Sequence, residues 1–155
     1  LDDNQLSRKL SGVAWSIFCR MNFEDKKHMG DQFLRSVDSI GANIAEGYGR
    51  YHYLDKVRFY YNARGSHFES FIHWLELLAE REKISGTEYQ SIRVTAQSLL
   101  VKLNNFINTT ANHARKTDTQ QKAHAHNCKP HKPRQAPKGV ISRQSKRACR
   151  VSSKA

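Results

Sequence analysis

Apolar side chains recur at helical spacing over the first two thirds of this 155-residue chain. The first stretch shows the period most simply, because its apolar residues fall on one narrow face when each residue turns the chain by about 100°. We therefore predict a helix over residues 3–22, with the face Leu6, Leu10, Val13, Ile17 and Met21. The same period continues throughout this part of the chain and favours an all-α fold.

Three more helices are predicted over residues 27–46, 53–81 and 89–110, with Gly47 and Gly49 ending the second and a turn at residues 84–87. The helix over residues 53–81 has two neighbouring apolar stripes. One is Val57, Tyr61, Phe68, Ile72, Leu75 and Ala79, and the other is Tyr60, Ala63, Phe71, Trp74 and Leu78. Four amphipathic helices joined by short loops bury one another as an antiparallel up-down four-helix bundle, which we predict for residues 1–112.

Positive charge is concentrated after this bundle. Residues 1–112 hold 14 Lys and Arg against 13 Asp and Glu, whereas residues 113–155 hold 12 against the single Asp118. No Phe, Tyr or Trp follows Phe106. A segment so poor in large apolar residues cannot offset an ordering cost of roughly 1–2 kcal/mol per residue. We therefore predict that residues 113–155 form a basic, intrinsically disordered tail that is ordered only on binding.

The tail is the leading candidate for nucleic-acid binding. Its bases are spread among Pro, Gly, Ser and Gln, which suits an extended chain that follows phosphates. The candidate residues are Lys129, Lys132, Arg134, Lys138, Arg143, Lys146, Arg147 and Arg150 in the tail, and Arg50, Lys56 and Arg58 in the bundle. Without aromatic side chains, the tail is expected to bind charge rather than base sequence. The alternative is a tail that only aids solubility.

Several other classes of protein are not expected. No apolar run approaches the roughly 18–20 residues of a membrane span, and no stretch has the pattern of a signal peptide, so we expect a cytoplasmic protein without membrane contact. The cysteines Cys19, Cys128 and Cys149 are an odd and scattered set, unlike a disulfide framework. Reduced thiols are expected.

Neither a metal nor a catalytic site is predicted. His124, His126, Cys128 and His131 offer four zinc ligands, but structural zinc sites generally draw two pairs of ligands from separated segments. Ser66, His67 and Glu69 lie on one helix, where adjacent residues point apart, so they cannot form a nucleophile and base among themselves. We expect a protein that is not an enzyme and has no cofactor.

One segment carries a resemblance to a known family. Residues 31–50, with the core Asn43-Ile44-Ala45-Glu46-Gly47, are followed by Ala63-Arg64-Gly65-Ser66 and Glu69. Over about residues 5–110 the chain resembles a four-helix-bundle family that includes proteins encoded in intervening sequences of bacterial large-subunit ribosomal RNA genes. The same family includes the accessory variability protein of diversity-generating retroelements. The resemblance implies a homopentameric barrel that binds nucleic acid and, in the retroelement branch, a reverse transcriptase.

Helical geometry also suggests residues for an oligomer interface. Trp15 lies opposite the apolar face of its helix, and Arg35, Ser39 and Glu46 lie away from the apolar face of theirs. Arg64 falls within an apolar face, where a charge needs a partner, and Glu46 of another subunit is one candidate. We therefore predict an oligomer interface that contains Trp15, Arg35, Ser39, Glu46 and Arg64.

Three functions are compatible with these observations. The leading hypothesis is a non-enzymatic, oligomeric nucleic-acid-binding protein that assists a retroelement reverse transcriptase by holding template RNA or its cDNA. The second is a ribosomal-RNA-associated protein of the intervening-sequence branch. The third is a purely structural homo-oligomer.

Overall fold

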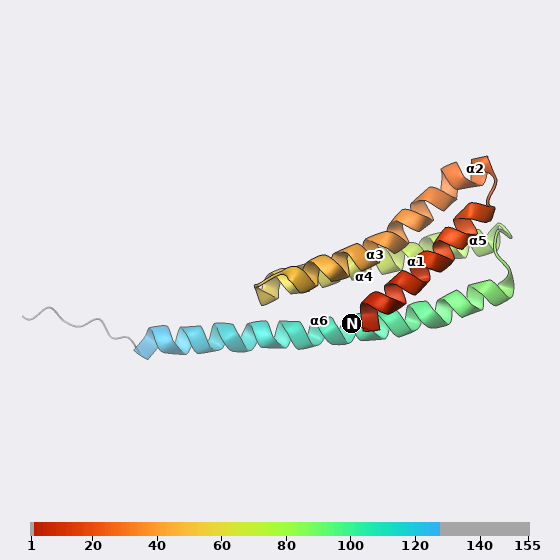
Figure 1. Ribbon diagram of the computed structural model, residues 1–155. Helices are drawn as coiled ribbons and strands as arrows, with labels where there is room; N and C mark the ends of the chain where they lie inside the picture. Colours follow the sequence, from red (N-terminus) through yellow and green to blue (C-terminus); the bar gives the residue numbers. More distant parts are fainter. Residues whose placement is uncertain (1, 128–155) are drawn as a thin grey trace, which may run out of the picture.

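The computed structural model describes the backbone of residues 2–127 and the side chains of residues 4–120 except Asp118. The helices form four segments (Figure 1). The first is α1 (Asp2–Arg20), and the second joins α2 (Phe23–Asp25), the π-helical turn η1 (Lys26–Gly30) and α3 (Asp31–Gly49). The third joins α4 (Tyr53–Phe68), the π-helical turn η2 (Glu69–Trp74) and α5 (Leu75–Glu80), and the fourth is α6 (Gly86–Asn127). The described residues contain no strand, which confirms the all-α prediction.

The four segments run up and down and close a ring of contacts. In this ring α1 packs on α3, α3 on α4, α4 on α6, and α6 on α1, so α1 and α4 lie diagonally across the bundle. The predicted helices over residues 3–22 and 27–46 correspond to α1 and to the segment that ends with α3. Within residues 2–127, none of the helices combines the length and the apolar character that a membrane span requires.

One continuous core fills the bundle. Every helical segment contributes to it, and its most deeply buried large side chains include Ile17, Phe33, Ile40, Leu75 and Leu99. The predicted faces of the first, second and fourth helices supply most of these residues. The core therefore follows the apolar period of the sequence over about 100 residues.

The third segment buries only part of its two apolar stripes. Of its two apolar stripes, the one with Tyr60, Ala63 and Phe71 is buried, whereas Tyr61, Phe68 and Ile72 of the other are 46%, 46% and 61% exposed. The turn η2 lies inside this segment, and a π-helical turn changes the rotation per residue. A wheel drawn at a constant 100° therefore could not identify the face that points inward.

The fourth segment is longer than predicted. We expected its helix to fade near Thr110, but α6 continues to Asn127 and extends past the turn between α3 and α4 (Figure 1). Residues 111–127 contain neither Gly nor Pro, and several are good helix formers such as Ala, Lys, Arg and Gln. Local propensity thus carries the helix beyond the last core residues, and the predicted boundary at residue 112 lies inside α6.

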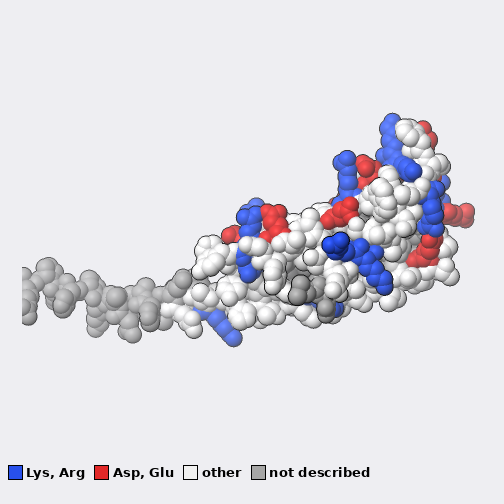
Figure 2. Space-filling view, viewed as in Figure 1, with Lys and Arg blue, Asp and Glu red and all other residues white. Residues whose placement is uncertain are grey.

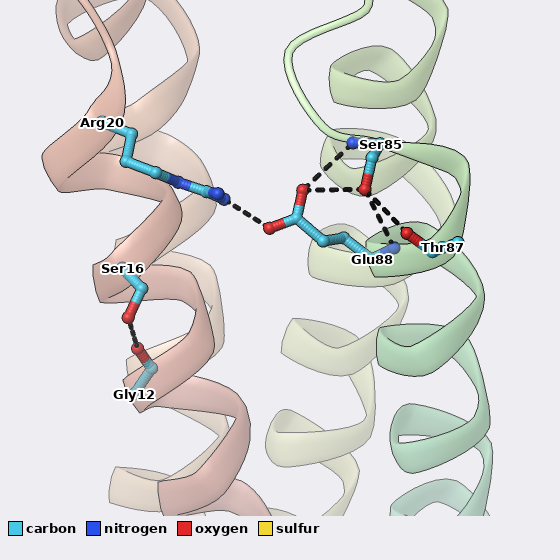
Figure 3. A network of polar contacts seen from close by, with 6 residues as sticks. All are labelled: Gly12, Ser16, Arg20, Ser85, Thr87 and Glu88. Atoms are coloured by element: carbon cyan, nitrogen blue, oxygen red, sulfur yellow. Dashed lines mark hydrogen bonds and ion pairs between the residues drawn. The ribbon is translucent and has the colours of Figure 1, made fainter.

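A capping box starts α6 and is tied to α1 (Figure 3). The Ser85 hydroxyl accepts a hydrogen bond from the backbone N–H of Glu88 at 3.2 Å, and the Glu88 carboxylate accepts one from the backbone N–H of Ser85 at 3.1 Å. Arg20 of α1 donates to the same carboxylate at 2.6 Å. The backbone hydrogen bond from Ser85, followed by the Arg20 contact, lowers the pKa of Glu88.

Helices α3 and α4 approach each other closely at Gly47. A Cβ at this buried position would lie 2.8 Å from Cε1 of Tyr60 and 3.1 Å from Cβ of Phe59. Since the Tyr60 ring is itself buried, it has little room to move aside. Glycine at position 47 is therefore required by the packing of α3 on α4.

We predict that Gly47→Ala destabilises the fold by about 1–3 kcal/mol because the added methyl group overpacks the Tyr60 ring. Urea unfolding followed by circular dichroism measures this change. Gly12→Ala in α1 is the matched control, because a Cβ there meets no atom within 4 Å. The control is expected to stabilise the protein by about 0.5–1 kcal/mol through the higher helix propensity of alanine. Equal stability of both variants would contradict the packing argument.

A buried histidine joins α4 to α6. His67 is 3% exposed, and its Nε2 lies 2.8 Å from the carbonyl oxygen of Ala96, which can only accept a hydrogen bond. Nε2 therefore carries the proton of the neutral ring. Among the described residues Nδ1 has no hydrogen-bond partner, and the ring packs against Phe68 and Phe71. Burial lowers the pKa of His67, and its hydrogen bond to Ala96 opposes this shift.

This environment predicts that the protein loses stability in mild acid. The unfolded chain takes up the His67 proton near the ordinary pKa of 6.5, while the folded chain takes it up only at lower pH. The stability that neutral His67 contributes is therefore fully present above its ordinary pKa, and it falls as the pH drops below that value. Urea unfolding between about pH 7.5 and pH 5 measures the slope. His67→Gln, which can still donate to Ala96 but does not titrate, is expected to have a shallower slope. If His67→Gln has the same slope of unfolding free energy against pH as the unmodified protein, groups other than His67 cause the pH dependence.

Candidate nucleic-acid interface

The predicted tail candidates lie outside the residues that the structure describes. They are Lys129, Lys132, Arg134, Lys138, Arg143, Lys146, Arg147 and Arg150. The cluster of His and Cys between residues 124 and 131 lies outside the described side chains as well. Counted from the sequence, residues 128–155 hold nine Lys and Arg with no Asp or Glu, a net charge of +9. Most of the net charge of +12 therefore follows the end of α6.

Two of the three candidates in the bundle meet in one groove. Arg50 and Lys56 line a groove with a volume of about 1050 Å³, which residues 50–57 form together with α6 between Ala111 and Thr117. Arg58 is exposed on α4 but does not line this groove. The groove lies between the α3–α4 turn with the start of α4 and residues 111–117 of α6. In Figure 1 this turn lies alongside α6.

Tyrosine and histidine rings shape this groove. Tyr53 stacks on His113 of α6 with ring centroids 5.7 Å apart and an angle of 19° between the planes. This contact fixes the start of α4 against α6. Tyr51 makes an edge contact with His52, at 5.2 Å and 85°, and is 90% exposed. The groove therefore has one fixed aromatic pair and one open tyrosine ring.

The charges of the groove are mainly positive. Arg50, Lys56 and Arg115 line it, and Asp55 is the acidic residue among the lining residues. Arg50 also forms an ion pair with Glu46 one helical turn earlier and lies over the Phe59 ring at 4.6 Å. Since this ion pair is exposed on both sides, it contributes only about 0–1 kcal/mol, and Arg50 can exchange it for another anion at little cost.

Sequence reasoning missed Arg115, Tyr51, Tyr53 and His113 as candidates. The run Arg50-Tyr51-His52-Tyr53 contained a signal, because aromatic rings next to a base are typical of nucleic-acid-binding surfaces. Arg115 had no such signal, since its place in the groove depends on the extension of α6 past residue 112. Elsewhere on the bundle, Figure 2 shows basic and acidic side chains lying next to one another on several parts of the visible face.

The predicted interface residues are not all turned outward. Trp15 is 55% exposed and stacks on Phe18, and Arg35 is exposed and paired with Asp31 of its own helix. Ser39 is a correction. It is half-buried between α3 and α4, where its hydroxyl accepts hydrogen bonds from Ser66 at 3.1 Å and Asn43 at 3.1 Å.

Arg64 has partners within its own chain. It donates to the side-chain oxygen of Asn104 at 3.3 Å, and its guanidinium group lies 4.8 Å from the centroid of the Tyr61 ring. Glu46 pairs with Arg50 instead of Arg64. An ion pair between Glu46 and Arg64 across a subunit boundary stays a prediction, but the described structure does not need it to satisfy either residue.

The described residues form an all-helical bundle of four segments, and a basic segment follows it in the sequence. The model of the 23S rRNA-intervening sequence protein family matches residues 1–105. The chain therefore belongs to this family, which confirms the resemblance seen in the sequence.

A solved structure has the same fold. It is the crystal structure of a protein of unknown function from the S23 ribosomal protein family from Bacteroides thetaiotaomicron, with 27% sequence identity and a TM-score of 0.63. The match covers 68% of this chain and 97% of the other. No curated protein matches the chain significantly.

Proposed function

We propose that this protein is a non-enzymatic RNA-binding protein that associates with ribosomal RNA. The main observation behind this proposal is the separation of charge. Residues 1–127 hold 17 Lys and Arg against 14 Asp and Glu, while residues 128–155 carry a net charge of +9. A cationic segment attached to a nearly neutral bundle is suited to a polyanion. The name of the matching family supports RNA of the ribosomal type as that polyanion.

The family match changes the order of the hypotheses. Our leading expectation from the sequence was a reverse-transcriptase accessory protein, with ribosomal-RNA association as the alternative. Since the matching family model is named for 23S rRNA intervening sequences, we now place the ribosomal-RNA hypothesis first. A gene embedded in a ribosomal RNA operon would support it, whereas a neighbouring reverse-transcriptase gene with a variable repeat would support the other.

The first test removes the basic extension. A chain truncated after Asn127 is expected to keep its helical signal but to bind RNA at least about tenfold more weakly at 50 mM salt, because fewer counterions are released. Filter binding at about 50 mM and 200 mM salt should also show a smaller loss of affinity with salt than in the full chain.

A full-length control separates charge from length. In this variant the nine Lys and Arg of residues 128–155 are replaced by Gln, and we expect it to bind like the truncated chain. If both variants bind RNA as tightly as the unmodified protein, the extension is not the main site and the charge argument is wrong.

We also infer that the protein self-associates through two different exposed apolar surfaces. One is Trp15 on α1, and the other is the outer stripe, which consists of Tyr61, Phe68 and Ile72. Because α1 and α4 lie diagonally across the bundle, the two surfaces belong to different sides of one chain. Contacts between unlike surfaces produce rings when the rotation closes. This supports the ring-shaped homo-oligomer, a homopentamer, that the family resemblance implies.

Substitutions on either surface are expected to reduce the size of the assembly. Trp15→Ser and Phe68→Ser should each lower the molar mass by light scattering while the helical signal is retained, because about half of each residue is exposed. Phe23→Ser is the control, since Phe23 is 75% exposed but belongs to neither surface. A single-chain mass for the unmodified protein, or an unchanged mass for both variants, would contradict this inference.

A further inference from the structure

The groove holds more than phosphate binding requires. A surface that contacts only the phosphates of RNA needs cations, and three groove cations together with the basic extension supply them. Such a surface does not require the Tyr51 ring, which is 90% exposed beside those cations. An open aromatic ring next to cationic side chains suits single-stranded nucleic acid, because an unpaired base can stack on the ring while the cations hold the flanking phosphates. A duplex keeps its bases stacked inside and offers little to such a ring.

We propose that this groove binds an unpaired stretch of RNA, with one base stacked on Tyr51 and the neighbouring phosphates held by Arg50, Lys56 and Arg115. The proposal rests on the proposed RNA-binding function and adds that the protein selects single-stranded over double-stranded regions.

The geometry assigns different roles to the two tyrosines. Tyr53 is stacked on His113 and thereby holds the start of α4 on α6, so it builds the wall of the groove. Within the described side chains, the ring contact of Tyr51 is an edge contact with His52. This contact covers at most one face of the Tyr51 ring. Because the Tyr51 ring is highly exposed, it is the ring on which a base can stack. The groove volume of about 1050 Å³ lies just above the roughly 300–1,000 Å³ found for small-molecule sites, so it has room for a nucleotide and part of its neighbours.

The charges of the groove are compatible with a strand that crosses it. Arg50 and Lys56 come from the α3–α4 turn and the first turn of α4, and Arg115 comes from the opposite wall on α6. Cations on both walls can contact phosphates on either side of a stacked base. Asp55 lies on the α4 wall, where its negative charge repels phosphate. Stacking on Tyr51 is therefore the contact that better distinguishes single-stranded from double-stranded RNA.

The decisive experiment compares Tyr51→Ala with Tyr51→Phe in the full-length protein. The probes are a single-stranded RNA of about 12 nucleotides that contains 2-aminopurine and an RNA duplex of the same length. Tyr51→Ala is expected to weaken single-strand binding by about 5- to 150-fold and to leave duplex binding within about twofold, since stacking contributes on this scale. Tyr51→Phe keeps the aromatic ring and should bind the single strand like the unmodified protein, with the same quenching of 2-aminopurine.

Tyr48→Ala is the matched control. Tyr48 is also an exposed tyrosine, at 67%, but it lines a separate small pocket with Ile44 and Phe106. Its replacement should leave both affinities unchanged. Thermal unfolding of each variant checks that the bundle is intact.

The outcomes separate this inference from the proposed function. If the unmodified protein binds neither probe, the proposed function fails and the inference with it. If it binds both probes equally and Tyr51→Ala changes nothing, the proposed function stands and the stacking inference is overturned. Equal weakening of both probes by Tyr51→Ala also overturns it, because a ring that stacks on an unpaired base should not matter for a duplex.

Discussion

The close packing of α3 on α4 determines how the rest of the molecule is arranged. Gly47 admits the Tyr60 ring, and the Ser39–Ser66 pair joins α3 to α4 at 3.1 Å. The Ser36–Ser70 pair continues this contact from α3 to η2 at 2.9 Å. Small side chains at these positions let the two helices approach over most of their length. The polar hydroxyls are satisfied by one another and by backbone carbonyls, so their burial adds no unpaired group. This contact also fixes the turn between α3 and α4, which carries Arg50 and the open ring of Tyr51.

Much of the fold could be predicted from the sequence because the helical period is strong. The first two helices and the turn before α6 were located to within a few residues. The capping box of Ser85 and Glu88, which starts α6 three residues before the predicted helix, was not predicted. The inward face of the third segment could not be identified, because it carries two apolar stripes and the turn η2 alters its rotation. The end of α6 was missed because the apolar period fades near Thr110 while helix propensity continues.

The groove depends on contacts that no local pattern specifies. Tyr53 and His113 are 60 positions apart in sequence, and their stacking requires both the bundle topology and the extension of α6. Arg50 and Lys56 were predicted from charge alone, whereas the importance of Tyr51 follows from its exposure beside them. Similarly, Ser39 was assigned to an outer surface by wheel geometry, but its hydrogen bonds join α3 to α4. Pattern analysis identified the residue types, and packing decided which of them lie together.

In the proposed function, the groove and the basic extension have different parts in RNA binding. Charge attraction acts over roughly a Debye length, about 8 Å at physiological salt, and does not depend on whether a base is unpaired. Stacking acts only in contact and requires an unpaired base. Because α6 rises about 1.5 Å per residue, His113 and Asn127 are separated by about 20 Å along the helix, and the cations of residues 128–155 begin there. If the proposed function holds, RNA captured by these cations would be held at a high effective concentration near Tyr51, so that a stacking contact that is weak by itself could select which part of the RNA is retained.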